Sequence, residues 1–188
     1  MHVNDIGHCK PDETFFPCYQ SDMPTPKPAQ ATTDRAQDAI ASALRTLEAE
    51  GSGVDALKAA LRDGLGRSFA VAVDTIRGAE GRVIVSGMGK SGHVARKIAS
   101  TLASTGTPAF FVHPSEASHG DLGMIANTDV ILALSWSGET AELRNITDYS
   151  RRYGIKLIAI TAIADSALAK VADVSLVLPQ AREACPHN

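Results

Sequence analysis

The sequence predicts an α/β protein built on a doubly wound parallel sheet of five strands. After Gly81, five short runs rich in β-branched residues alternate with segments whose apolar residues have helical spacing. Each run is almost continuously apolar, which is typical of parallel strands covered by helices on both faces. The length of 188 residues and the hydrophobic fraction of 44% suit one such domain with a sizeable core.

The N-terminal segment is expected to be a flexible leader over residues 1–33. It carries several prolines, among them Pro24, Pro26 and Pro28, and has no sustained apolar period. The domain itself is predicted over residues 34–188.

Three helices are predicted before the sheet. From Asp34 onward, apolar residues recur at helical spacing up to Leu47, and the Gly51–Gly53 stretch is expected to end this first helix. A second helix is predicted over Val54–Leu65 and a third over Ser68–Gly78.

The five strands are predicted at Arg82–Ser86, Ala109–Val112, Val130–Leu134, Lys156–Ile160 and Val174–Leu178. Further helices are expected to start at Ser91 and Thr140. Ligands of open α/β sheets bind at the carboxyl ends of the strands, so the loops after the first four strands are the places to look for function.

Composition excludes several classes of partner. The formal net charge is −3 and no block of like charge occurs, so neither a nucleic acid nor an anionic membrane is an expected partner. No membrane-length apolar run or secretory signal is visible, which favours a cytoplasmic location. The three cysteines form no disulfide framework, and the spacing of Cys9 and Cys18 fits no common zinc motif.

The loop after the first strand is rich in glycine. Gly87, Gly89 and Gly92 leave backbone N–H groups at a helix start open to an anion, with Lys90 and Ser91 beside them. The spacing matches a dinucleotide fingerprint literally, but the acidic residue that would bind a ribose is not evident, and a Walker A motif does not fit. Tight turn geometry alone is the alternative interpretation.

The loop after the third strand carries three hydroxyls. Ser135, Ser137 and Thr140 surround the predicted start of a helix that contains Glu142, and this arrangement favours phosphate binding. A capping box without a ligand is the alternative. Glu139 is expected to cap a helix rather than to move protons.

The loop after the second strand contains the titratable residues His113, Glu116, His119 and Asp121. His119 has the chemistry to move protons near neutral pH, with His93 of the glycine turn as its rival. His113, which precedes a proline, is expected to be structural.

Long stretches of the sequence resemble the SIS (sugar isomerase) domain of D-arabinose-5-phosphate isomerases. The resemblance rests on Gly87–His93, Ser104–Pro114, Glu116–Met124, Ser135–Glu139 and Arg182–Pro186. It implies a flavodoxin-like, five-stranded parallel sheet flanked by helices. It also implies interconversion of D-ribulose 5-phosphate and D-arabinose 5-phosphate through a cis-enediol, which supplies Kdo for lipopolysaccharide. This chemistry requires no cofactor and no metal.

The resemblance also implies roles for individual residues. Lys90, His119 and Glu142 are the expected catalytic residues: Glu142 as the enediol base, His119 in ring opening or proton transfer between oxygens, and Lys90 in stabilising charge. Either Glu142 or His119 could be the base. Residues expected to bind the phosphate are Ser91, Ser135, Ser137, Thr140, Gly87 and Gly89.

Family members continue beyond the Cys185–Pro186 segment into a last helix with a second histidine, and often into paired CBS regulatory domains. This sequence is therefore expected to be truncated at its C-terminal end. The family also suggests a homotetramer. Two alternatives stay open: a non-catalytic phosphosugar-binding SIS module, and an SIS isomerase that acts on another sugar phosphate.

Overall fold

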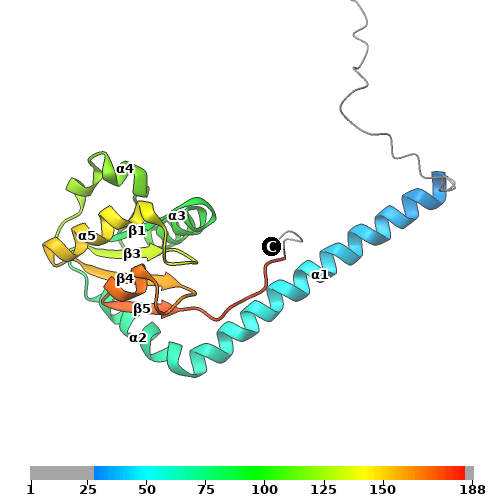
Figure 1. Ribbon diagram of the computed structural model, residues 1–188, viewed down its shortest axis with the longest axis horizontal. Coiled ribbons are helices and arrows are strands. Elements are labelled where there is room, and N and C mark those ends of the chain that lie inside the picture. Colours follow the sequence, from blue (N-terminus) through cyan, green and yellow to red (C-terminus); the bar gives the residue numbers. More distant parts are fainter. Residues whose placement is uncertain (1–27, 185–188) are drawn as a thin grey trace, which may run out of the picture. The chain divides into compact units, whose positions relative to one another are not determined.

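The computed structural model describes residues 28–184, which contain a five-stranded parallel sheet with helices on both faces (Figure 1). The strand order is β2-β1-β3-β4-β5. The strands are β1 (Val83–Gly87), β2 (Ala109–Phe111), β3 (Val130–Leu134), β4 (Lys156–Thr161) and β5 (Val174–Val177). Each predicted strand is found within a residue or two of its expected bounds. The predicted α/β fold class is therefore confirmed.

Side chains alternate between the two faces of the sheet. Ile84, Ile131 and Leu157 belong to one buried cluster together with residues of the helices that follow β2, β3 and β4. Val85 and Leu132 belong to a second cluster, packed against the helices that precede and follow β1. Since both faces are covered, every position of β1 and β3 is buried. This burial explains why the strands read as continuous apolar runs.

The helices before the sheet differ from the prediction. One helix, α1 (Pro28–Arg62), runs without interruption through Gly51–Gly53, so the predicted break there is wrong. Glycine lowers helix propensity by about 1 kcal/mol but does not forbid helical backbone angles. Inside the helix, the Ser52 hydroxyl donates to the Ala49 carbonyl at 2.7 Å. Residues 1–27 of the expected leader lie outside the described residues, and residues 28–33 belong to α1.

The real helix boundary is at Asp63, which separates α1 from α2 (Gly64–Arg77). The predicted helices over 54–65 and 68–78 are therefore wrong in their bounds. Asp63 leaves helical geometry with φ −109° and ψ −142°. A Cβ at position 66 would collide with the Leu61 carbonyl, so this turn depends on glycine at that position.

The remaining helices surround the strand ends. They are α3 (Gly89–Ser104), α4 (Pro114–Ser118), the 3₁₀ turns η1 (Asp121–Met124) and η2 (Ala141–Leu143), α5 (Arg144–Tyr153) and α6 (Ala167–Val171). The helix predicted from Thr140 therefore begins as a 3₁₀ turn and becomes α-helical only at Arg144. Helix α3 starts two residues before the predicted Ser91.

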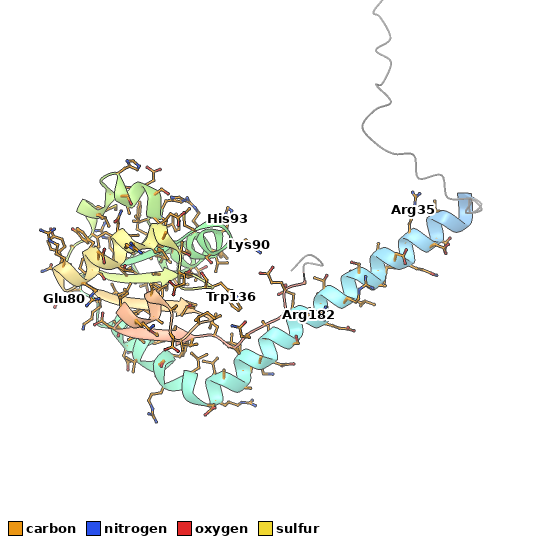
Figure 2. The ribbon with its side chains drawn as sticks, in the orientation of Figure 1. Arg35, Glu80, Lys90, His93, Trp136 and Arg182 are labelled. Atoms are coloured by element: carbon orange, nitrogen blue, oxygen red, sulfur yellow. The ribbon has the colours of Figure 1, made fainter. Side chains whose placement is uncertain are left out.

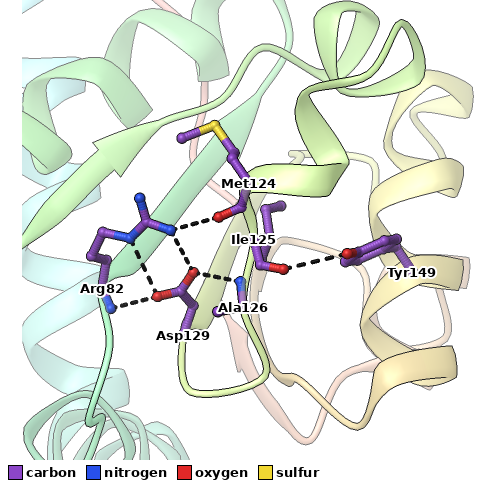
Figure 3. A network of polar contacts seen from close by, with 6 residues as sticks. All are labelled: Arg82, Met124, Ile125, Ala126, Asp129 and Tyr149. Carbon is purple, nitrogen blue, oxygen red and sulfur yellow. Dashed lines mark hydrogen bonds and ion pairs between the residues drawn. The ribbon is translucent and has the colours of Figure 1, made fainter.

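An ion pair lies at the amino ends of β1 and β3, between Arg82 and Asp129 (Figure 3). The Asp129 carboxylate is 2% exposed and accepts hydrogen bonds from the Arg82 guanidinium at 3.0 Å and from the Arg82 and Ala126 backbone N–H groups at 2.7 and 2.9 Å. The guanidinium also donates to the Met124 carbonyl at 2.6 Å. These contacts anchor the segment that joins η1 to β3.

The chain divides into two units between Ala43 and Leu44. The sheet, its flanking helices and all the candidate site residues belong to the second unit. In the described part of the chain, no helix combines the length and the apolar character needed to cross a membrane. Cys9, Cys18 and Cys185 lie outside the described residues, so the predictions about the cysteines stay untested.

Candidate functional site

The candidate site lies at the switch point of the sheet. Strand β2 lies on one side of β1, and β3 lies on the other side. The connections after β1 and β3 therefore run in opposite directions along the sheet, which leaves a crevice between the carboxyl ends of these two strands. Gly87 at the end of β1 is the register partner of Leu134 at the end of β3. The glycine turn after β1 and the loop after β3 are separated by nearly fifty residues in sequence, but they therefore start side by side.

The glycine turn places the start of α3 directly against β1. Gly89 has φ +53°, a conformation that glycine adopts at no steric cost. A Cβ at position 92 would lie 2.7 Å from the Gly87 carbonyl oxygen, so only glycine permits this approach. The turn thus brings the N-terminus of a 16-residue helix to the edge of the sheet, with Lys90 exposed and Ser91 half-buried. Figure 2 shows Lys90 and Trp136 at this same edge.

Residues 135–140, called here the serine loop, are held by their own side chains. The Ser135 and Thr140 hydroxyl oxygens are 2.7 Å apart, and the Gly138 N–H donates to Ser135 Oγ at 3.0 Å. Ser135 is 3% exposed, so its hydroxyl is used inside the loop. Ser137 is exposed and its hydroxyl accepts the Glu139 N–H at 3.2 Å. The loop therefore presents one exposed hydroxyl on a rigid turn.

The serine loop also packs against the start of α6. Gly138 has φ +68°, and a Cβ there would collide with the Ser166 side chain. The Glu139 carboxylate accepts the N–H of Ala167, the first residue of α6, at 2.8 Å. Glu139 thus caps a helix, as expected from the sequence, but this is α6 and not the helix that follows the loop.

The loop after β2, which carries His113 and His119, is joined to the segment that carries Glu142. His113 accepts the Ser115 N–H on Nδ1 at 3.3 Å and caps α4, which agrees with the structural role predicted for it. His119 ends α4 and is exposed. The Asn145 amide donates to the Ser118 hydroxyl at 2.7 Å, and α4 packs against η2. The elements of His119 and Glu142, the latter exposed in η2, are therefore in contact.

Lys90 has a partner that the sequence did not reveal. Its Nζ lies 3.3 Å from a carboxylate oxygen of Glu183, 93 residues further along the chain. Both side chains are exposed, by 89% and 52%. Within residues 28–184, no hydrogen bond or ion pair joins Lys90, His119 and Glu142 to one another. Glu183 lies in one of the stretches that carry the family resemblance, but no local motif pairs it with Lys90.

The described side chains include no group of three or more His, Cys, Asp and Glu residues arranged to hold a metal ion. The polar groups at the site are instead N–H donors, hydroxyls, one lysine, one histidine and carboxylates. Such a set suits binding of an oxyanion and proton transfer.

Comparison with known proteins supports the same interpretation. A family model described as the SIS domain matches residues 75–187. The chain is 53% identical over 151 residues to arabinose 5-phosphate isomerase KdsD of Pseudomonas aeruginosa, covering 80% of this chain and 45% of that protein. It is 47% identical over 149 residues to arabinose 5-phosphate isomerase KpsF of Escherichia coli, covering 79% and 46%. The chain thus spans about half the length of the curated relatives it matches.

A similar solved structure is that of an Escherichia coli CFT073 protein in complex with arabinose 5-phosphate. It has a TM-score of 0.74 and 39% sequence identity, and the match covers 80% of this chain and 78% of that one.

Proposed function

Because the chain belongs to the SIS domain family, we propose that it is the isomerase domain of an enzyme that interconverts D-arabinose 5-phosphate and D-ribulose 5-phosphate. The observation that carries the proposal is the pairing of the glycine turn with the serine loop at the switch point. The names of the KdsD and KpsF relatives and the sugar-phosphate complex of the Escherichia coli neighbour support the substrate.

The phosphate binds between the serine loop and the glycine turn. Ser137 donates its exposed hydroxyl, while the backbone N–H groups near Gly87 and Gly89 and the dipole of α3 attract the anion. Ser91 closes the turn. Ser135 accepts the Gly138 N–H and shares a hydrogen bond with Thr140 that either hydroxyl can donate. With Ser135 as the donor, the Thr140 proton is free to be donated to the phosphate.

The reaction moves two protons and no other atoms. Glu142 removes the proton from C2 of the open-chain aldose, and its electron pair forms the C1–C2 double bond of a cis-enediol as O1 gains a proton. The same carboxylic acid returns a proton to C1 while O2 loses its own, which gives the ketose. His119 opens the sugar ring or carries the proton between O1 and O2. Deuterium incorporation in the two variants Glu142→Gln and His119→Gln distinguishes this assignment from the reverse one.

Lys90 stabilises the negative charge that develops on O1 and O2. Its only close partner among the described residues is Glu183, and both groups are exposed, so this contact is weak and readily exchanged for substrate. The proposed site requires neither metal nor organic cofactor, because carboxylate and imidazole groups suffice for the two proton transfers.

The product would supply the synthesis of Kdo for lipopolysaccharide. The proposed location is the cytoplasm, where sugar phosphates are metabolised, and the proposed assembly is a homotetramer. The proposed domain comprises residues 34–188, and the helix α1 in which it starts already begins at Pro28.

A coupled assay tests this function. The chain is incubated with D-arabinose 5-phosphate, D-ribose 5-phosphate or D-glucose 6-phosphate, and ketose formation is measured for the wild type and for Glu142→Gln. Glu80→Gln is the matched control, since Glu80 is exposed at the opposite edge of the domain (Figure 2). We expect turnover of the arabinose phosphate alone, lost only in Glu142→Gln. Binding without turnover would support a non-catalytic phosphosugar-binding module. Turnover of another aldose phosphate would support an isomerase that acts on another sugar phosphate.

A further inference from the structure

A hollow lies on the other side of β1 from the serine loop. It has a volume of about 150 Å³ and is lined by Gly87, Gly89, Gly92, His93, Arg96, Phe111 and His113. Strand β2, which supplies Phe111, pairs with β1 on the side away from β3. The hollow and the serine loop therefore flank the glycine turn from opposite sides.

The polar side chains of this hollow, those of His93, Arg96 and His113, are cationic or neutral donors. Arg96 is always charged, and its guanidinium stacks over the Phe111 ring, 4.0 Å from the ring centroid. His93 and Arg96 stand three positions apart on α3 and so share one face of the helix. No acidic residue lines the hollow.

The donors have free hydrogen-bonding capacity. Within residues 28–184, Arg96 forms no ion pair and no hydrogen bond through its side chain, so its N–H groups are available to a ligand. His113 accepts the Ser115 N–H on Nδ1, which leaves the proton of the neutral ring on Nε2 as a donor. The stacked guanidinium is pre-oriented, so little conformational entropy is lost when it forms a bidentate contact.

We propose that the hollow formed by His93, Arg96 and His113 is a second oxyanion site that binds a phosphate group separately from the serine loop. Its volume admits one phosphate or carboxylate group and not a whole nucleotide. The proposed isomerase reaction uses none of these three side chains. A phosphate held here is either free inorganic phosphate or the phosphate group of a sugar phosphate. The experiment distinguishes these sources.

The test uses histidine ring NMR signals of the full chain, with His93 and His113 assigned through His93→Gln and His113→Gln. Sodium phosphate is titrated at constant ionic strength, in parallel with D-arabinose 5-phosphate and with unphosphorylated D-arabinose. We expect saturable shifts of both signals with phosphate and none with D-arabinose. Shifts with the sugar phosphate that persist in Ser137→Ala would mean that the hollow accepts phosphate monoesters. Shifts that persist there with inorganic phosphate alone would restrict the hollow to the free ion.

Two variants decide where the phosphate binds. Arg96→Gln should weaken the phosphate-induced shifts at least tenfold, while Lys97→Gln removes the same charge from the neighbouring exposed position and should leave them unchanged. Ser137→Ala should also leave them unchanged. The proposal is overturned if the shifts persist in Arg96→Gln, if they disappear in Ser137→Ala, or if sodium chloride produces them equally. Melting curves of each variant confirm that the fold is retained.

Discussion

The hydroxyl oxygens of Ser135 and Thr140 lie 2.7 Å apart across the serine loop, and Ser135 also accepts the N–H of Gly138. These bonds close a turn directly after β3 and leave the Ser137 hydroxyl exposed. Ser135 and Ser137 therefore differ in the structure, although they are alike in sequence: the first organises the loop, and the second is the one proposed to meet the phosphate.

Alanine substitutions of the two serines should differ in their effects on D-arabinose 5-phosphate binding and on stability. Ser137→Ala should raise the dissociation constant by about tenfold to a hundredfold, because one hydrogen bond to a charged group is lost, and should leave the melting temperature unchanged. Ser135→Ala should weaken binding and also lower the melting temperature, since the buried Gly138 N–H keeps only its longer bond to the Ser135 carbonyl and Thr140 loses its hydroxyl partner. Fluorescence of Trp136, the chain's one tryptophan, reports the binding from within the loop. Ser100→Ala on α3 serves as the control, and equal behaviour of Ser135→Ala and Ser137→Ala would contradict the distinction.

The serine loop should tolerate no side chain at position 138. Gly138→Ala combines a left-handed backbone with a collision against Ser166, so we expect a loss of about 2–4 kcal/mol in the free energy of unfolding. Gly154→Ala is the matched control. Gly154 has nearly the same φ, +66° against +68°, but nothing within 4 Å of its added Cβ, so only the backbone cost of about 1 kcal/mol applies. Urea denaturation measures both, and equal losses would refute the packing argument.

Replacing Lys90 should reduce turnover without affecting stability. Lys90→Met removes the charge proposed to stabilise the enediol oxygens, so we expect kcat to fall by about a hundredfold. The Lys90–Glu183 pair is exposed and contributes little to folding, so the melting temperature should not change. Steady-state kinetics and thermal melting of the same preparation check the two expectations. A variant that melts early but retains its kcat would show that Lys90 is structural.

The Arg82–Asp129 pair should make the fold sensitive to acid. Burial, the largest influence, acts to raise the pKa of Asp129, but hydrogen bonds from the Arg82 side chain and from the backbone N–H groups of Arg82 and Ala126 outweigh it and lower that pKa. The lowered folded-state pKa means that the stabilisation is fully present above the ordinary aspartate pKa of about 4 and is lost as the pH falls through the folded value. Unfolding followed from pH 7 to pH 2 should show this decline below about pH 4.

Asp129→Asn provides the variant for the same experiment. At pH 7 its free energy of unfolding should be about 2 kcal/mol lower than that of the wild type, because the charge-assisted hydrogen bonds are lost. The loss is not larger because the Arg82 side chain is 39% exposed and can turn to water. The difference from the wild type should shrink as the pH falls below 4. A difference that is constant across this range would show that the carboxylate charge is irrelevant. Asp173, whose pKa is also lowered by hydrogen bonds from the Leu157 N–H and Lys156 despite its burial, contributes to the acid sensitivity of both proteins.

The sheet was predictable because its central strands β1 and β3 are buried on both faces, so their residues form apolar runs that no helix period explains. The position of the site followed from the sheet, since the loops after β1 and β3 must meet at the switch point. The helices before the sheet were harder to predict. Gly51 and Gly53 resemble a break, but helical hydrogen bonds continue through them, and the real turn depends on Gly66 approaching the Leu61 carbonyl.

Contacts between distant segments could not be read from local patterns. The spacing of Glu139 indicated a cap but not which helix it caps, because α6 meets the serine loop only in the folded chain. The contact between Lys90 and Glu183 joins residues 93 positions apart, and no periodicity or motif relates them. The family resemblance supplied the proposed roles of Lys90, His119 and Glu142, which spacing alone left open.

The most direct test of the proposed chemistry is isomerisation of D-arabinose 5-phosphate in D₂O, followed by NMR, with wild type and Glu142→Gln compared at equal concentration. A cis-enediol whose carbon-bound proton exchanges with solvent gives D-ribulose 5-phosphate that carries deuterium at C1, and Glu142→Gln should form neither product nor deuterated aldose. If Glu142→Gln retains deuterium incorporation while His119→Gln loses it, His119 is the base. Isomerisation at the wild-type rate in both variants, with unchanged deuterium incorporation, would contradict the proposed mechanism.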